Sequence, residues 1–212
     1  MKYLMNEMDP YKNRDVNPVA SLSYFIWQKD GALSKDFCNH LIEKFDKDPD
    51  LYDGHIGEGV VNKEIKQTQD LCVSSRDHWK EEDEVLYESL KTNMEEYNTH
   101  VKNLHPCVGL NGVYDFKDTG YQIQRYEPGG FYEWHNDWTM NKEDGSRVYT
   151  YIWYLNTLKK KEGGYTQFVD GSKVQPKAGK VVLFPATWNY LHRAFPATKR
   201  KYICTGWIYA KL

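Results

Sequence analysis

Several features that would place this 212-residue sequence in a special class are missing from it. No run of about 18 apolar residues occurs, so we expect no segment that crosses a membrane. The first residues, MKYLMNEMDPYKNRD, lack the apolar stretch of a secretory signal, which leads us to expect a cytoplasmic protein. No long basic run is present and the formal net charge is −2, so electrostatics do not point to a nucleic-acid partner.

Cysteine is also scarce, and the four cysteines Cys38, Cys72, Cys107 and Cys204 form no CxxC pair. This wide spacing favours free thiols in a reducing compartment over a disulfide framework. Internal repeats and low-complexity segments are lacking too. The pattern along the chain indicates one domain, residues 1–212, with a support region at 1–110 and a core at 111–212.

Aromatic residues, in contrast, are abundant, with 17 Tyr, 7 Trp and 8 Phe. They suit either the core of a β-rich fold or a surface on which ligands stack, and for most of them we expect the core.

Two helices are expected in the first half of the chain. Residues 35–47 carry apolar side chains at helical spacing behind Ser34, which is a suitable N-cap. A second amphipathic helix begins near Glu81 with an acidic first turn that suits the helix dipole, and it ends at His105 before a proline.

The rest of the chain reads as strands and loops. Ser21–Gln28 is a short β-prone run, whereas the glycines and prolines of Pro49–Asn62 predict a loop. Beyond residue 110, short segments rich in β-branched and aromatic residues are separated by Gly, Pro or Asp, at 120–127, 147–156, 165–169, 180–184 and 201–209. Helices followed by strands predict a mainly β, α+β fold in which helices pack against an antiparallel sheet or barrel.

Three residues stand out as candidate metal ligands. His135 and Asp137 form a His-x-Asp pair, and residues i and i+2 of a strand point to the same side. His192 is the candidate third ligand, and two histidines with one carboxylate form the facial triad of non-haem iron(II) oxygenases. The alternative is a surface histidine beside a turn-forming aspartate.

The sequence around these residues resembles a known family. QIQRYEPGGFYEWHND places Tyr126 nine and Tyr132 three residues before His135, and RVYTYIWYLN, EGGYTQF, KVQPKAGKVVLFP and HRAFPATKRKYICTGWIY follow it. From Gln122 to the C-terminus the chain is similar to the prolyl 4-hydroxylase branch of the 2-oxoglutarate/iron(II) oxygenases. This resemblance implies a double-stranded β-helix, a jelly-roll core of the cupin-like kind, with the metal at the mouth of the barrel.

The resemblance also implies a cation for the distal carboxylate of 2-oxoglutarate. Lys201, nine residues after His192 and six before Trp207, is our choice, with Lys199 and Arg200 as rivals. A buried carboxylate must be paired. On the last strand Lys201, Ile203, Thr205 and Trp207 should face one side, although a lysine on a solvated edge strand is the alternative.

Further site residues are expected around the metal. Tyr126, Thr150 and Trp207 are assigned to cosubstrate binding, since a hydroxyl can share a carboxylate with the lysine. Arg147 and Trp188 are assigned to substrate binding, where Arg147 can hold a carbonyl, although pairing with an acidic residue and core packing are the respective alternatives.

The function implied is that of an iron(II)- and 2-oxoglutarate-dependent dioxygenase. It would use O₂, with ascorbate as a further candidate reductant, and would hydroxylate a prolyl residue of a peptide or protein while releasing succinate and CO₂. A free amino acid or another small molecule is an alternative substrate. A cupin-like metal protein without oxygenase activity and a catalytically silent binding module are alternatives of other classes, and the intact triad counts against the second of these.

Overall fold

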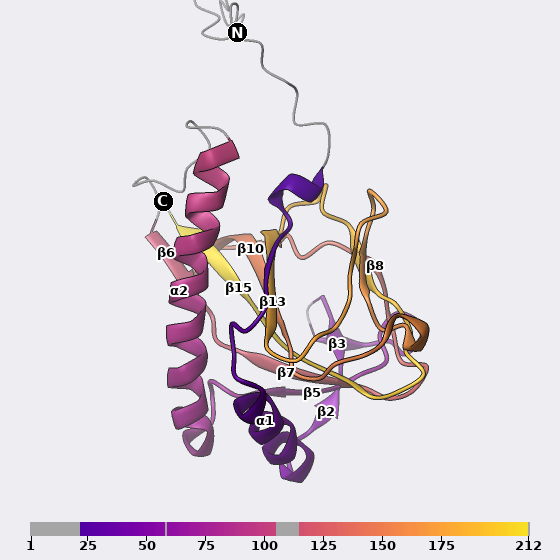
Figure 1. The fold of residues 1–212 in the computed structure, drawn as a ribbon. Helices are drawn as coiled ribbons and strands as arrows, with labels where there is room; N and C mark the ends of the chain where they lie inside the picture. Colours follow the sequence, from indigo (N-terminus) through magenta and orange to yellow (C-terminus); the bar gives the residue numbers. More distant parts are fainter. Residues whose placement is uncertain (1–21, 58, 105–114, 212) are drawn as a thin grey trace, which may run out of the picture.

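The computed structural model describes residues 22–57, 59–104 and 115–211 (Figure 1). Its helices are α1 (Lys35–Lys47) and α2 (Lys80–Leu104), with short 3-10 turns at Leu22–Phe25, Asp77–Trp79 and Lys160–Glu162. Its strands are β1 (Trp27–Lys29), β2 (Tyr52–Asp53), β3 (His55–Ile56), β4 (Val60–Val61), β5 (Gln69–Cys72), β6 (Asp115–Asp118), β7 (Gln122–Tyr126), β8 (Tyr132–His135), β9 (Met140–Asn141), β10 (Gly145–Tyr154), β11 (Thr166–Phe168), β12 (Lys173–Val174), β13 (Lys180–Pro185), β14 (His192–Ala194) and β15 (Lys201–Lys211). Within this described part of the chain, no helix has the length and apolar run that a membrane crossing requires.

Helix α1 forms where the sequence predicts it, and for the expected reasons. The Ser34 side chain accepts a hydrogen bond from the amide of Phe37, which caps the first turn. Cys38, Leu41 and Phe45 make up its buried face. The predicted second helix is confirmed as α2, which begins one residue before Glu81.

Two antiparallel sheets form the body of the molecule. The main sheet has the strand order β1-β13-β10-β15-β7-β5-β2, with β6 and β9 pairing at its margins. The minor sheet has the order β12-β11-β14-β8. Both helices lie against one side of the main sheet, and the minor sheet lies on the other (Figure 1). The predicted mainly β fold with flanking helices is therefore confirmed.

Side chains of the main sheet alternate between two layers. Tyr151 and Trp153 of β10 join the core under the helices, whereas Ile152 between them joins a second core against the minor sheet. Strand β15 alternates in the same way, because Tyr202 faces the helices and Ile203 faces the minor sheet. The space between the sheets is therefore lined by every second residue of β10 and β15, and the candidate site lies there.

Three expectations about the first half need correction. Ser21–Gln28 is not one strand, because Leu22–Phe25 forms a 3-10 turn and only β1 pairs with the sheet. Pro49–Asn62 is not all loop, because it contains β2, β3 and β4. Strand β5 was not expected, since its sequence QDLC has little β propensity, and its pairing with β7 comes from tertiary contacts.

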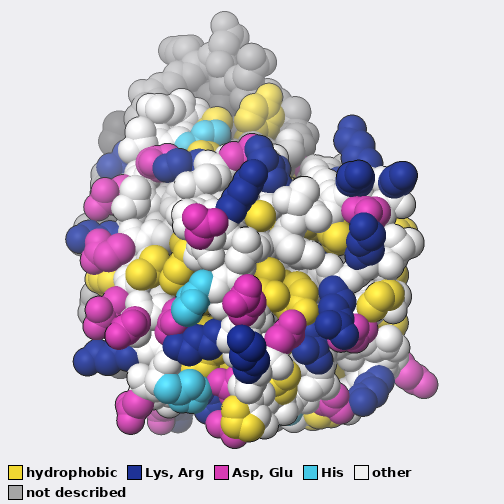
Figure 2. Space-filling view, turned by 60° about the horizontal axis from the view of Figure 1, so that its bottom comes forward, with side chains coloured by type: hydrophobic (Ala, Val, Ile, Leu, Met, Phe, Trp, Pro, Cys, Tyr) yellow, Lys and Arg dark blue, Asp and Glu magenta, His cyan; other side chains and the backbone are white. Residues whose placement is uncertain are grey.

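The surface at the α1 end carries charges of both signs. Figure 2 shows acidic, basic and histidine side chains interspersed on this face. Two histidines here each contact a buried carboxylate: His40 Nε2 lies 2.6 Å from Glu82 Oε1, and His78 Nε2 lies 2.8 Å from Asp48 Oδ2. These contacts join α1 to the first turn of α2, and Asp48 after α1 to the 3-10 turn that precedes α2.

Candidate metal and cosubstrate site

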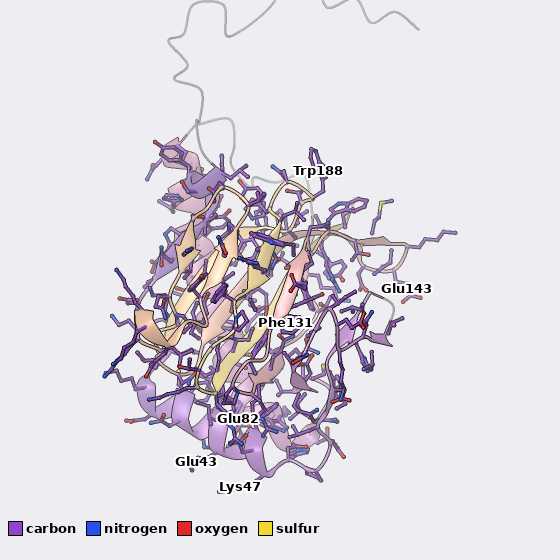
Figure 3. The ribbon with its side chains drawn as sticks, turned by 90° about the vertical axis from the view of Figure 1, so that its right-hand side faces the viewer. Glu43, Lys47, Glu82, Phe131, Glu143 and Trp188 are labelled. Atoms are coloured by element: carbon purple, nitrogen blue, oxygen red, sulfur yellow. The ribbon has the colours of Figure 1, made fainter. Side chains whose placement is uncertain are left out.

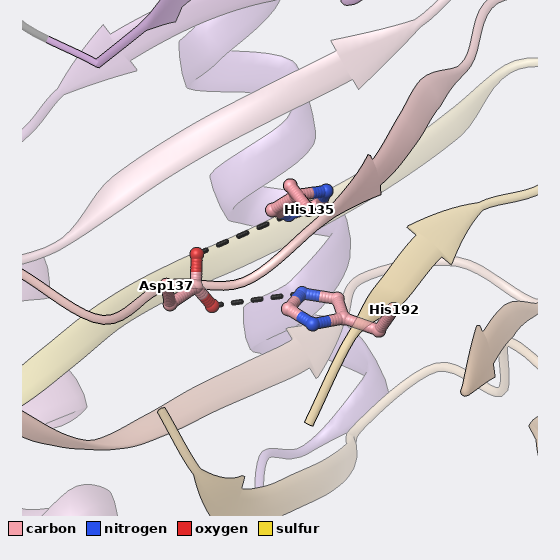
Figure 4. A group of neighbouring side chains, drawn as sticks. All are labelled: His135, Asp137 and His192. Atoms are coloured by element: carbon pink, nitrogen blue, oxygen red, sulfur yellow. Dashed lines mark ion pairs between the residues drawn. The ribbon is translucent and has the colours of Figure 1, made fainter. Parts of the chain in front are cut away.

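The structure brings the three candidate ligands together (Figure 4). Strands β8 and β14 pair so that His135 lies directly opposite His192. Asp137 follows β8, with Oδ1 3.9 Å from His135 Nε2 and Oδ2 3.5 Å from His192 Nε2. One ligand atom from each residue falls within 4.8 Å of the others. The spacing is compatible with one metal ion bound between them.

Asp137 reaches the site in a different way from the one predicted. The strand ends at His135, so strand alternation does not orient Asp137. Its Oδ2 instead accepts a hydrogen bond of 2.8 Å from the Thr150 hydroxyl, which projects from β10 of the main sheet. Thr150 therefore holds the Asp137 carboxylate against the main sheet. The sequence had assigned Thr150 to cosubstrate binding, whereas in the structure its hydroxyl contacts a metal ligand.

Both imidazoles are oriented by a hydrogen bond at Nδ1, the ring nitrogen that points away from Asp137. His135 Nδ1 lies 2.7 Å from the carbonyl oxygen of Glu133, and His192 Nδ1 lies 3.0 Å from that of Tyr190. A carbonyl only accepts, so each Nδ1 carries the proton and each Nε2 presents its lone pair toward Asp137. This tautomer is the one that a metal-binding histidine requires.

The charges of the triad also suit a cation. Burial alone would raise the pKa of the Asp137 carboxyl, but His192, His135 and the Thr150 hydrogen bond outweigh it and hold that pKa below its usual value. Burial together with His192 lowers the pKa of His135. The lowered pKa values favour a neutral His135 and an ionised Asp137, the protonation states in which these two groups bind metal.

Lys201 lies in the same cavity as the triad. It is the first residue of β15 and is 1% exposed. Among the described residues no carboxylate pairs with it, and its ammonium lies 3.9 Å from the centre of the Tyr126 ring. Burial lowers the pKa of Lys201 to about 7. A buried cation without an anion fits a cavity that receives a carboxylate from outside.

The two rival cations lie outside the cavity. Lys199 pairs with Glu162 at 3.0 Å and Arg200 with Glu127 at 2.8 Å, and both side chains are more than half exposed. Neither lies on a strand. The expected alternation of β15 is confirmed, because Ile203, Thr205 and Trp207 line the cavity with Lys201.

Tyr126 and Trp207, which were assigned to cosubstrate binding, also line this cavity. The polar groups of both side chains lie close to other residues of the site. Tyr126 offers its ring to Lys201 and donates its hydroxyl to Gln124 Oε1 at 3.1 Å. The buried Trp207 indole nitrogen lies near enough to Asp137 to lower the pKa of that carboxyl further, but it makes no hydrogen bond of normal geometry. Gln124 was not expected from the sequence, although its position two residues before Tyr126 on β7 would have identified it.

The two residues assigned to substrate lie outside the cavity lining. The Arg147 guanidinium stacks on Trp207 at 3.9 Å, and its Nε donates to the Tyr209 hydroxyl at 2.5 Å. Its Nη1 lies 3.5 Å from the backbone oxygen of Asp137. Trp188 is 73% exposed and points outward at the end of the sheets away from α1 (Figure 3).

A comparison with protein families agrees with this geometry. Residues 121–209 match the family model described as the 2OG-Fe(II) oxygenase superfamily. The chain therefore resembles the 2OG-Fe(II) oxygenases. The match spans the triad, Lys201 and Trp207. It confirms the resemblance stated from the sequence, and with it iron(II) and 2-oxoglutarate as the cofactors of the matched superfamily, which the His-Asp-His group and Lys201 fit.

Solved structures agree on the fold. A viral collagen prolyl hydroxylase from Paramecium Bursaria Chlorella virus-1, solved as a 2OG complex, is 23% identical with a TM-score of 0.61 over 88% of this chain and 97% of that one. A prolyl hydroxylase from Trichoplax adhaerens, in complex with a hypoxia inducible factor peptide fragment, is 17% identical with a TM-score of 0.72 over 88% and 84%. A Pseudomonas putida prolyl-4-hydroxylase is 21% identical with a TM-score of 0.63 over 89% and 94%. The jelly-roll core is thus confirmed, while no curated protein sequence matches the chain significantly.

Proposed function

We propose that this chain is an iron(II)- and 2-oxoglutarate-dependent dioxygenase that hydroxylates a prolyl residue of a peptide or protein. One observation carries the proposal: Lys201, which is buried and pairs with no carboxylate in the described part of the chain, lines the same cavity as His135, Asp137 and His192. A metal-binding jelly roll of another kind needs the triad but has no need of a buried cation beside it. We further propose that the chain folds as one domain, with β1 and β5 from its first half in the main sheet.

Each residue of the cavity has a separate role in this proposal. His135, Asp137 and His192 hold iron(II) through Nε2, a carboxylate oxygen and Nε2. Lys201 pairs with the distal carboxylate of 2-oxoglutarate, and the Tyr126 ring holds the lysine in place. Bound iron(II) and 2-oxoglutarate supply the oxidising power for hydroxylation by O₂, with succinate and CO₂ as products. Lys201 and His192 are 1% and 4% exposed, so bulk water has little access to these two groups.

A peptide substrate is supported by the surface near the triad. Trp138, Met140 and Trp188 are all large, apolar and at least 48% exposed. Trp138 follows Asp137 directly, and the segment after β13 that bears Trp188 lies at the same end of β10 as β9. Exposed apolar side chains beside a polar site are typical of a surface that binds a partner. In this proposal Trp188 contacts the substrate. Arg147 supports the backbone of Asp137 and is a second candidate for contact with the substrate.

The test is succinate formation with a panel of substrates. We expect release of succinate that depends on added iron(II) and is stimulated by at least one proline-containing peptide. The matched control is the same peptide with each proline replaced by alanine. Stimulation by free amino acids or other small molecules, but by no peptide, would overturn the substrate assignment and leave the oxygenase intact. A protein that binds iron(II) but never converts 2-oxoglutarate would be a cupin-like metal protein.

A further inference from the structure

A buried ion pair lies beside the cavity but has no part in the proposed chemistry. Lys66 Nζ lies 2.6 Å from Asp70 Oδ2, and the side chains are only 3% and 0% exposed. Removing two charges from water is costly, and the attraction within the pair offsets this cost only with good geometry. The contacts of this pair with the metal-bearing strand suggest a role for it.

The ion pair joins the two sheets at the metal-bearing strand. The Gln67 amide donates to the Phe131 carbonyl, and the Glu133 amide donates to the Ile65 carbonyl, each at 2.8 Å. The segment 65–67 therefore runs antiparallel to β8 and extends the minor sheet at that edge. Asp70 belongs to β5 of the main sheet. The Lys66–Asp70 contact thus spans the point at which the chain passes from one sheet to the other.

Lys66 also contacts a side chain that packs on a metal ligand. Its ammonium lies 5.3 Å from the centre of the Tyr132 ring, within the range of a cation–π contact. The Tyr132 ring stacks on His135 with centroids 3.6 Å apart and planes 13° apart. Tyr132 therefore links the buried lysine to the imidazole of His135.

His135 needs this support more than His192 does. His192 is buried and held edge-on by Phe184, with centroids 4.9 Å apart. His135 lies at the last residue of β8 and keeps 16% side-chain exposure. Its hydrogen bond to Glu133 fixes one ring atom, but a second contact is needed to fix the plane of the ring. The stacked Tyr132 supplies that contact.

We infer that Lys66, held by Asp70, is a positioning residue that fixes the imidazole plane of His135 through Tyr132. This inference rests on the proposed role of His135 as a metal ligand. Groups that orient a ligand from outside the coordination sphere typically change metal affinity 10–100-fold when removed. Lys66 itself touches neither metal nor cosubstrate in this arrangement.

Two kinds of variant separate positioning from simple stability. Tyr132→Leu removes the stack, whereas Tyr132→Phe keeps the ring. The double variant Lys66→Met/Asp70→Leu removes both charges and leaves no buried ion unpaired. Its matched control is Lys177→Met/Asp30→Leu, because that pair is about half exposed and lies on the surface.

The measurement is titration of the metal-free proteins with Co(II), followed by calorimetry and by the visible absorption spectrum, with thermal midpoints recorded for each. We expect Tyr132→Leu and the buried double variant to bind Co(II) at least about tenfold more weakly and with an altered spectrum. Tyr132→Phe and the surface double variant should bind like the wild type.

A folded Lys66→Met/Asp70→Leu protein with wild-type affinity and spectrum would overturn the inference. If that variant does not fold, Tyr132→Leu decides instead, and wild-type binding there overturns the inference equally. If the wild type itself does not bind Co(II), the proposed metal site fails, and this inference fails with it. Tight Co(II) binding by the wild type, with weaker binding by Tyr132→Leu and by the buried double variant, supports both the metal site and the positioning role of Lys66.

Discussion

Replacing Lys201 with methionine tests the cosubstrate site most sharply. Methionine keeps most of the length of the buried side chain but removes its charge. The distal carboxylate of 2-oxoglutarate would then be buried without a partner, since no other cation lines the cavity among the described residues. Breaking a buried ion pair costs on the order of 3–5 kcal/mol. At about 1.4 kcal/mol per power of ten, affinity for 2-oxoglutarate should fall by roughly two to three and a half powers of ten.

The assay is a titration of each iron-loaded protein with 2-oxoglutarate, without oxygen, followed by absorbance of the iron chelate. Lys199→Ala and Arg200→Ala are the controls, because both side chains are exposed and pair with surface carboxylates. They should bind 2-oxoglutarate within about twofold of the wild type, as expected for exposed ion pairs. Iron affinity should be unchanged in all three variants. A large loss in Arg200→Ala beside normal binding by Lys201→Met would refute the assignment.

Because of the lowered pKa of Lys201, we also expect the affinity for 2-oxoglutarate to depend on pH. Burial lowers the pKa of Lys201 to about 7, so the cavity loses its charge as the pH rises through that value. Binding of the carboxylate above pH 7 then requires uptake of a proton. Affinity for 2-oxoglutarate should be level below about pH 6.5 and fall as the pH rises to about 8.5, by up to tenfold per pH unit. Lys201→Met should lack this dependence, and an equal slope in the variant would show that another group titrates.

Three other perturbations have clear expected outcomes. Thr150→Val removes the hydroxyl that holds Asp137 and should weaken Co(II) binding about tenfold. Thr150→Ser keeps a hydroxyl and should bind Co(II) like the wild type. Unchanged Co(II) affinity in Thr150→Val would mean that this hydrogen bond does not contribute to metal binding. Trp188→Ala should raise KM for a peptide substrate severalfold without changing affinity for 2-oxoglutarate, and equal kinetics would place the peptide elsewhere. Although burial alone would raise the pKa of Asp48, hydrogen bonds from His78 and Trp79 lower it, so its stabilising effect is present above its usual pKa and is lost as the pH falls through the lowered value. The thermal midpoint should therefore drop more steeply below about pH 5 in the wild type than in Asp48→Asn, and parallel curves would contradict this.

The sequence predicts those parts of the fold that depend on local patterns. Helix α1 follows from its apolar spacing and from Ser34, and β15 follows from a run of β-branched and aromatic residues. Strand alternation also places Lys201 on the cavity side of β15. These features need no information about distant residues.

Other features depend on contacts between segments that lie far apart in the sequence. The pairing of residues 65–67 with β8 and the stack of Tyr132 on His135 arise only when the two sheets meet. Asp137 lies beyond the end of its strand, so its orientation comes from Thr150 across the cavity. An i, i+4 spacing such as that of Lys66 and Asp70 indicates an ion pair only on a helix, and here the pair forms across a sheet crossing.

In the proposed enzyme, iron(II) held by the triad and 2-oxoglutarate held by Lys201 act together in one cavity. The most direct test is the release of succinate from 2-oxoglutarate in air by the wild type and by His135→Ala, each with and without iron(II). We expect iron-dependent succinate release by the wild type and none above background by a folded His135→Ala protein, because that variant loses a metal ligand. Equal release by the two proteins, or release that does not depend on iron(II), would contradict it.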